Sequence, residues 1–298
     1  MRKRTRIFLL IIVPLLAALL IYLLFSKPDI PGLETMSLQE WFRCPSPVKT
    51  DGMNHKIKVA ATALQSMADK DSSVAQIIQM AEKIKREQPD VRLITFGEAS
   101  TGLYHYPENP RRYQQSIAET IPGRVTDTLG DLARRLGVFI SAGLIEKAGD
   151  TLYNSIVVVD PAGNIVARHR KSLLHYYDEL NGVTAAENSA SVFQIDHFKV
   201  GLSICADANS TWLVNNYREQ QIDLLIYSVT SNVPWIIKQF RYWPVARKYN
   251  AWIVASNRFG REGKDDYTGL VFIADKKGAI DQKSDKTSGY ITATIGKD

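Results

Sequence analysis

The sequence predicts a layered α/β domain that follows a single transmembrane helix. An apolar run occupies residues 7–25, close to the N-terminus. From Lys56 onward, strand-like apolar runs alternate with amphipathic segments, which is the pattern of sheets covered by helices. No repeat and no shift in composition divides residues 56–298, so we expect one domain there. With 45% hydrophobic and 23% charged residues among 298, the chain is neither disordered nor collagen-like.

Residues 7–25 form the predicted transmembrane helix. All nineteen are apolar apart from Pro14 and the amphipathic Tyr22, and at 1.5 Å per residue they span roughly 28 Å of bilayer. Secretory signal peptides have a shorter apolar region of roughly 7–15 residues followed by small residues, whereas this run is followed by Ser26-Lys27-Pro28. We therefore expect an uncleaved signal anchor. The alternative, a cleaved export signal, also takes the chain out of the cytoplasm.

A basic tail of six residues precedes this helix and sets the expected topology. Its charges are Arg2, Lys3, Arg4 and Arg6. The positive-inside bias places residues 1–6 in the cytoplasm and the domain outside it, in a single-pass protein of the cell membrane whose catalytic part is periplasmic or extracellular. The same four residues supply most of the formal charge of +6, so no basic face for nucleic acid is expected.

Residues 26–55 form a predicted stem between the helix and the domain. They contain four prolines and show no sustained period of 2 or 3.6. One of the two cysteines, Cys44, lies in this stem, and the other, Cys205, lies in the domain. A bridge between them would consume a thiol that the chemistry below requires, so we expect Cys44 to be dispensable and not bridged to Cys205.

The elements of the domain follow from the spacing of apolar residues. Strands are predicted near residues 58–64, 91–96, 138–143, 153–159, 165–170, 191–195, 199–204, 224–228, 252–256, 270–274 and 290–294. Helices are predicted at residues 74–87, 125–136, 211–220 and 235–249. Turn sequences at residues 160–164 and 275–278 predict two hairpins.

Three reactive side chains each follow one of these strands: Glu98, Lys171 and Cys205. Catalytic groups gather at the carboxyl ends of strands in α/β sheets, so we expect these three to meet at one pocket. A cysteine attacks as a thiolate, a glutamate can accept its proton, and a lysine can lower the thiol pKa and stabilise an oxyanion. The backbone N–H of Ala206 can share that oxyanion if Cys205 lies on a tight strand-to-helix turn.

Three motifs carry a resemblance to a known family. They are Leu93-Ile94-Thr95-Phe96-Gly97-Glu98, Arg168-His169-Arg170-Lys171 and Gly201-Leu202-Ser203-Ile204-Cys205-Ala206-Asp207. In order and spacing the motifs resemble the signature of the nitrilase, or carbon-nitrogen hydrolase, superfamily. Supporting segments at residues 153–155, 255–260 and 269–273 extend the resemblance to roughly residues 56–295.

The resemblance implies a four-layer αββα sandwich with a Glu-Lys-Cys triad and no cofactor. In this triad Glu98 is the general base and acid, Lys171 stabilises the tetrahedral intermediate, and Cys205 becomes acylated. Family members also carry a second glutamate near the pocket, for which Glu179 is the better-placed match and Glu187 the weaker one. A homodimer is the assembly that the resemblance suggests.

Further positions are predicted on the pocket wall. The oxyanion and pocket candidates are Ala206, Tyr104, Asn232 and Trp235. Departures from the family pattern at Gly97, Ala206 and residues 209–211 fall on this wall, so they affect the substrate more than the reaction type. Asp207 fits the family pattern, but a short acid at a helix start is more simply explained as a cap.

Amide hydrolysis is the leading functional prediction, at C–N bonds other than peptide bonds. A second is acyl transfer, since residues 231–235 and the extracytoplasmic placement are similar to apolipoprotein N-acyltransferase; residues 56–298, however, contain no second apolar span. A third is an inactive, tethered binding module, which the intact Glu98, Lys171 and Cys205 disfavour. The histidines lack metal-ligand spacing, so no metal is expected, and His169 and His175 are predicted at the surface or pocket wall.

Overall fold

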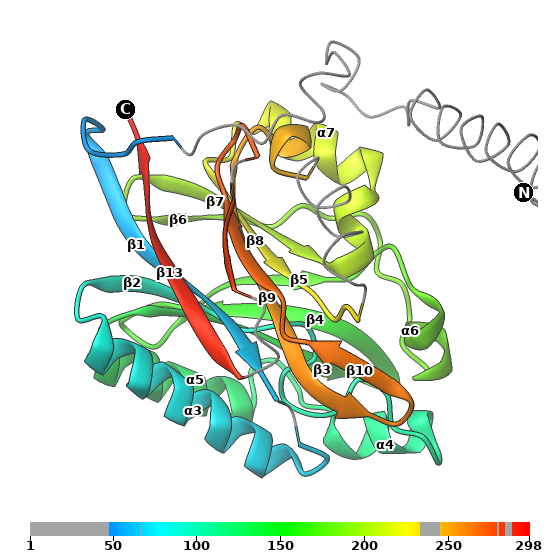
Figure 1. The fold of residues 1–298 in the computed structure, drawn as a ribbon. Coiled ribbons are helices and arrows are strands. Elements are labelled where there is room, and N and C mark those ends of the chain that lie inside the picture. The colour runs from blue at the N-terminus through cyan, green and yellow to red at the C-terminus, as the bar shows by residue number, and fades with distance from the viewer. Residues whose placement is uncertain (1–47, 66, 233–244, 279, 284–287) are drawn as a thin grey trace, which may run out of the picture. The chain divides into compact units, whose positions relative to one another are not determined.

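The computed structural model describes residues 48–65, 67–232, 245–278, 280–283 and 288–298 (Figure 1). The predicted transmembrane helix at residues 7–25, the stem up to residue 47, Cys44 and Trp235 lie outside these residues. Within the described part of the chain, no helix is both long enough and apolar enough to cross a membrane. The first strand begins at His55, within one residue of the predicted start of the domain.

Two sheets joined at one edge organise the domain. The first has the order β5-β4-β3-β2-β1 with β13 antiparallel beside β1, and the second has the order β9-β8-β7-β6, with β10 and β11 paired to β9 and β12 paired to β11. Their bounds are β1 (His55–Leu64), β2 (Val91–Thr95), β3 (Phe139–Ala148), β4 (Thr151–Val159), β5 (Ile165–Arg170), β6 (Val192–Ile195), β7 (Phe198–Ile204), β8 (Leu224–Ser228), β9 (Trp252–Glu262), β10 (Asp265–Thr268), β11 (Val271–Ala274), β12 (Ile280–Lys283) and β13 (Gly289–Lys297). The sheets join where Ala63 and Leu64 pair with Asn257 and Arg258.

Alternation along the strands separates an inner core from two outer ones. Val59 and Ala60, for example, face opposite sides of the first sheet, because side chains alternate along a strand. Val59 joins a buried cluster that also takes Val200 and Val254 from the second sheet. Ala60 joins a cluster formed with helices α3 (Lys70–Glu87) and α5 (Arg124–Leu136).

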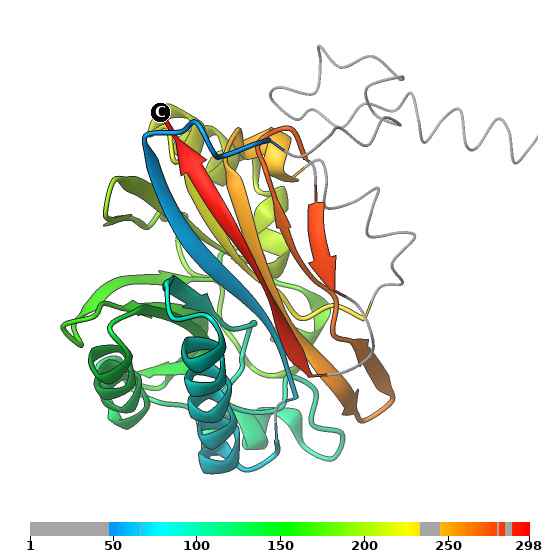
Figure 2. The same ribbon diagram turned by 60° about the vertical axis from the view of Figure 1, so that its left-hand side comes forward.

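A third cluster covers the outer face of the second sheet. It contains Leu213 and Tyr217 of helix α7 (Thr211–Glu219) and Val245 and Tyr249 of a further helical segment. The layers therefore run helix, sheet, sheet, helix, with α3 and α5 on one side and α7 on the other (Figure 2). This arrangement confirms the predicted α/β sandwich.

Local sequence explains why the principal helices begin and end where they do. Asp69 accepts a hydrogen bond from the backbone N–H of Ser72 at 2.8 Å and so caps α3. The buried side of α3 recurs every three or four residues, as an amphipathic helix requires: Val74, Ile77, Ala81 and Ile84. Helix α5 ends at Gly137, whose φ of 67° is a left-handed conformation that glycine adopts at little cost.

The short elements are those that the sequence pattern misses. They are α4 (Pro110–Ile117), α6 (Tyr176–Leu180), β10 and β12, of four to eight residues each. An element this short completes too few periods for its pattern to stand out from a loop. The predicted helix at residues 235–249 lies mostly outside the described residues, although residues 245–249 are helical. Both predicted hairpin turns are present, between β4 and β5 and between β11 and β12.

Candidate active site

Glu98 lies in the turn that follows β2, and its neighbours fix that turn tightly. Ala99 has a φ of 47°, a left-handed conformation that residues other than glycine rarely adopt. The guanidinium of buried Arg258 donates to the carbonyl oxygens of Glu98 and Ala99, at 3.0 and 2.9 Å. Gly143 lies so close that a Cβ added there would meet the Ala99 nitrogen at 2.6 Å. A strained turn persists only where its surroundings hold it in this way, so the position of Glu98 is well determined.

Lys171 follows β5 and lies completely buried between two carboxylates. Its Nζ donates to Glu98 Oε1 at 2.7 Å and to Asp178 Oδ2 at 2.6 Å. Burial opposes the charge of the ammonium, but the attraction of the nearby anions outweighs it, so the pKa of Lys171 is raised. The raised pKa favours the charged form of Lys171 in this buried position.

Cys205 begins the short 3₁₀ helix η1 (Cys205–Asn209) directly after β7. Its φ of 45° is again left-handed, which confirms the predicted tight strand-to-helix turn. Burial and the charge of Glu98 raise the pKa of the thiol to about 12, although Lys171 lowers it. The predicted effect of the lysine is thus present but outweighed. Cys205 rests as a neutral thiol and needs a base at the moment of attack.

Glu98 presents one oxygen that accepts hydrogen bonds and one without a donor in the part of the chain that the structure describes. Besides Lys171, the Nδ2 of Asn154 donates to Oε1, at 2.8 Å. Oε2 is buried and has no hydrogen-bond partner among the described residues. A buried acceptor without a donor is costly, so this oxygen is the available acceptor for a proton from the thiol or from a bound reactant.

The second carboxylate of the site is Asp178, and the expectation that placed Glu179 or Glu187 there is corrected. Both glutamates are exposed, whereas the side chain of Asp178 is completely buried. Asp178 Oδ2 also accepts the backbone N–H of His175 at 2.9 Å, which holds the side chain back against the start of α6. Glu179, one position further on, points about 100° around the helix and into solvent.

Asn154 is a site residue whose role sequence reasoning missed. Its Nδ2 bridges the two carboxylates, donating to Glu98 Oε1 at 2.8 Å and to Asp178 Oδ1 at 2.9 Å. Its backbone carbonyl also accepts the N–H of Lys171 at 2.8 Å. The available signal was its place in a segment that supports the family resemblance, but nothing in that segment indicates which carboxylates an amide would join.

A cavity of about 180 Å³ opens above Cys205. Of the four predicted wall residues, Tyr104, Ala206 and Asn232 line it, and Trp235 lies outside the described residues. The other lining residues are largely aromatic or neutral: His175, Tyr177, Cys205, Asn209, Tyr227, Thr230, Ser231, Val245 and Tyr267. The structure therefore brings a thiol, a base, a buried cation and a small cavity together.

The family model for carbon-nitrogen hydrolase matches residues 58–298. The chain belongs to the carbon-nitrogen hydrolase family. Omega-amidase NIT2 of Xenopus tropicalis is 27% identical over 198 residues, which cover 63% of this chain and 61% of the relative. A nitrilase of Pyrococcus abyssi is 29% identical over 204 residues, covering 67% and 75%. The matched region spans about three fifths of the length of the Xenopus omega-amidases.

Solved structures support the fold of this carbon-nitrogen hydrolase. An amidase from Nesterenkonia sp. AN1 superimposes with a TM-score of 0.72 at 15% identity, covering 84% of this chain and 94% of that one. Nit3 of Saccharomyces cerevisiae gives a TM-score of 0.71 at 20% identity, covering 84% and 93%. The similarity extends over nearly all of the described residues, which places this domain among nitrilase-like α/β folds.

Two expectations about residues around the carbon-nitrogen hydrolase site require correction. Asp207 does not cap a helix: its carboxylate accepts hydrogen bonds from His169 and from the loop after Lys171. Ser210 caps α7 instead, accepting the backbone N–H of Leu213 at 3.3 Å. His169 is buried rather than exposed, because Asp207 supplies an interior partner for its ring.

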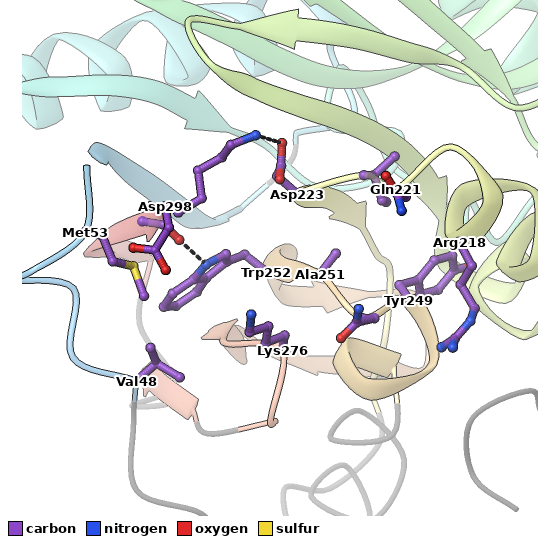
Figure 3. A pocket seen from close by; sticks show the side chains of 14 residues that line it. Val48, Met53, Arg218, Gln221, Asp223, Tyr249, Ala251, Trp252, Lys276 and Asp298 are labelled. Atoms are coloured by element: carbon purple, nitrogen blue, oxygen red, sulfur yellow. Dashed lines mark hydrogen bonds and ion pairs between the residues drawn. The ribbon is translucent and has the colours of Figure 1, made fainter. Parts of the chain in front are cut away.

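A larger cavity, of about 410 Å³, lies at the starts of the parallel strands β8 and β9, where Asp223 and Trp252 line it (Figure 3). Asp223, Trp252 and Lys297 are among its lining residues. Lys297 donates to Asp223 at 2.7 Å, and Trp252 Nε1 donates to the carbonyl of Gly296 at 2.9 Å. None of the described residues that line it belongs to the triad. The smaller cavity is therefore assigned as the candidate active site because reactive side chains lie beside it, although the other cavity has the larger volume.

Proposed function

We propose that this protein hydrolyses a small amide through a thioester on Cys205. The observation that carries the proposal is the buried cluster of Glu98, Lys171 and Asp178 beside a thiol on a strained turn. Separately, these residue types have ordinary structural uses. Together they supply a nucleophile, a proton acceptor and a fixed positive charge, which is the full set that acyl transfer from an amide requires.

The proposed acylation begins when Glu98 Oε2 takes the thiol proton and Sγ attacks the amide carbon. The carbonyl oxygen becomes an oxyanion, stabilised by the Lys171 ammonium and by the backbone N–H of Ala206. Glu98 then gives its proton to the departing nitrogen, the C–N bond breaks, and an amine or ammonia leaves. A thioester remains on Cys205.

Deacylation reverses these roles with water as the nucleophile. Glu98 takes a proton from the water, which attacks the thioester carbon, and Lys171 again faces the oxyanion. The C–S bond breaks, the carboxylic acid leaves, and the proton returns to the thiolate. Glu98 therefore has to alternate between base and acid, and its unpaired Oε2 suits that use.

The cavity supports a substrate with a small, uncharged acyl group. Its volume of about 180 Å³ is below the roughly 300–1,000 Å³ of drug-sized ligand sites. Tyrosines and neutral polar side chains form most of the described wall, including Tyr104, Tyr227 and Tyr267. A structural relative, the Nesterenkonia amidase, has the acetamide moiety of fluoroacetamide covalently added at its active-site cysteine. That adduct supports a nucleophilic role for Cys205.

We also propose that the hydrolase is tethered outside the cytoplasm as a single-pass membrane protein. The support is sequence alone: the apolar run at residues 7–25 and the four basic residues before it.

Intact-mass measurement of the chain with a series of aliphatic amides tests the proposed reaction. The expected result is a mass increase on Cys205 equal to the acyl group, followed by release of the free acid. The Cys205→Ala variant should show neither. Transfer of the acyl group to an added amine in preference to water would favour an acyltransferase. If no amide yields an adduct or an acid, the proposal is wrong.

A further inference from the structure

The carboxylate of Asp207 joins the two segments that carry Lys171 and Cys205. Its Oδ2 lies 3.0 Å from His169 Nε2, and both side chains are completely buried. His169 lies near the end of β5, two residues before Lys171. Asp207 is two residues after Cys205. The His169–Asp207 pair therefore connects the strand that precedes Lys171 with the turn that carries Cys205.

Three more donors converge on the other oxygen, Oδ1. The backbone N–H groups of Ser172 and Leu173 donate to it at 3.0 and 2.8 Å, and the Ser172 hydroxyl donates at 3.1 Å. Because Asp207 acts here as an acceptor throughout, we assign the shared proton to His169 Nε2. The other ring nitrogen, Nδ1, is buried without a partner among the described residues.

The turn that carries the nucleophile needs such support. A left-handed φ at a residue other than glycine is strained and persists only when its neighbours impose it. At Cys205 the φ is 45°. Tyr227 holds one side of the turn by donating to the Cys205 carbonyl at 3.0 Å. Asp207 holds the other side, against the loop that begins at Lys171.

We infer that Asp207, oriented by His169, is a positioning residue that sets the distance between the Cys205 thiol and the Lys171 ammonium. The inference rests on the proposed function, because it concerns the geometry of attack at Cys205. It assigns no contact with substrate to Asp207. Its effect on catalysis runs through the placement of the turn and the loop.

A graded series of variants in the full-length chain separates this role from mere stabilisation. Asp207→Ala removes all four hydrogen bonds, and Asp207→Asn keeps an acceptor for the two backbone donors but presents an N–H to His169. His169→Gln keeps an N–H close to the place of Nε2, whereas His169→Leu does not. The matched control is Asp223→Asn, since Asp223 likewise accepts a backbone N–H, from Lys199 at 2.8 Å, but at the other end of the strands.

The measurement is the rate constant of Cys205 acylation at saturating amide, with KM and Tm for each variant. We expect a loss of roughly 10²-fold for Asp207→Ala, as a misplacement of about 1 Å can cause. The loss should be smaller for Asp207→Asn and His169→Leu and smallest for His169→Gln, with KM changed little. Asp223→Asn should lower Tm and acylate at the parental rate. Should Asp207→Ala not fold, the asparagine and histidine variants carry the test.

Parental acylation rates in folded Asp207→Asn and His169→Leu would overturn the inference. So would an equal loss in Asp223→Asn at matched Tm, since that would reveal a purely structural effect. Amide hydrogen exchange gives a readout independent of turnover. The Ser172 and Leu173 amides should exchange faster in Asp207→Ala but not in Asp223→Asn. If the parent forms no adduct, the proposed function fails, and unchanged exchange at these two amides separately rejects the bridge.

Discussion

Lys171 Nζ lies 2.6 Å from Asp178 Oδ2, and neither side chain is exposed to solvent. The ammonium therefore has two buried anionic partners, Asp178 and Glu98. Two carboxylates around one cation leave a net negative charge close to the thiol, which favours proton removal by Glu98 over a preformed thiolate. Asp178 fixes the cation in place, so its loss should disturb both charge and geometry.

Replacing Asp178 should damage catalysis where replacing its neighbour does not. Asp178→Asn removes one anionic partner of Lys171 and should lower kcat/KM on amides by roughly 10²-fold through misplacement of the ammonium. Glu179→Gln, at the adjacent exposed position, is the matched control and should retain parental kinetics. Equal kinetics for the two variants would show that Asp178 is dispensable for the reaction.

Substitutions in the triad should reveal distinct roles. Cys205→Ala removes the nucleophile and should reduce turnover to background. Glu98→Gln should slow acylation by roughly 10²–10⁴-fold, the range of general acid–base catalysis. Lys171→Met should cost roughly 10²–10³-fold, by analogy with deleting one oxyanion donor.

These losses should not add. Because the three residues act as a unit, the double variant Glu98→Gln with Cys205→Ala should be no slower than Cys205→Ala alone. Single-turnover kinetics on one amide provide the comparison. Near-parental turnover by Cys205→Ala would contradict the thioester mechanism.

The raised pKa of the Cys205 thiol predicts an unusual alkylation profile. With a pKa of about 12, the thiolate fraction and hence the iodoacetamide rate should rise about tenfold per pH unit from pH 7 to beyond pH 9. Glu98→Gln removes a charge that raises this pKa, so alkylation at pH 8 should become faster while amide turnover falls. A plateau in the parental profile near neutral pH would indicate a preformed thiolate instead.

The same thiol should make stability depend on pH in the alkaline range. The folded chain holds this proton more tightly than the unfolded chain, whose thiol has an ordinary pKa near 9.0. The contribution to the free energy of unfolding is therefore fully present below pH 9 and is lost as the pH rises toward 12. Denaturant titrations should show a steeper alkaline decline for the parent than for Cys205→Ala.

A single methyl group at Gly143 should displace the base. The added Cβ would lie 2.6 Å from the Ala99 nitrogen and the Gly97 oxygen and 2.9 Å from the Glu98 Cα, so the turn would have to move. Gly143→Ala should lower both Tm and the acylation rate. Gly52→Ala, where nothing lies within 4 Å of the added carbon, is the control and should change neither.

Membrane topology can be tested with protease added to intact cells whose outer layer is permeable. If residues 7–25 anchor the chain with the domain outside, cleavage in the stem at residues 26–55 should release a soluble fragment. Immunoblotting for the domain measures this release, and a cytoplasmic protein serves as the control for lysis. Digestion only after lysis would reverse the predicted topology.

Local pattern was enough to identify the reactive residues. Glu98 and Cys205 follow the largely buried, apolar strands β2 and β7, which are recognisable from period and composition, and Lys171 follows the half-exposed strand β5. The same pattern gave the bounds of β5 and β8 without error. The predicted transmembrane helix at residues 7–25 also follows from the sequence alone, because the length of an apolar run is a property of the sequence. These residues lie outside the described part of the chain.

Sequence patterns were sufficient to predict an α/β domain and to single out Glu98, Lys171 and Cys205 as candidate catalytic residues. Folding was needed to distinguish Asp178 from Glu179, because one residue turns a helical side chain by about 100° and the start of α6 fixes which of the two faces Lys171. It also decided that Asp207 serves His169, 38 residues away, rather than its own helix. Residues that are far apart in sequence and form hydrogen bonds only after folding leave no local sequence pattern. Their contacts depend on which strand ends the fold brings close together.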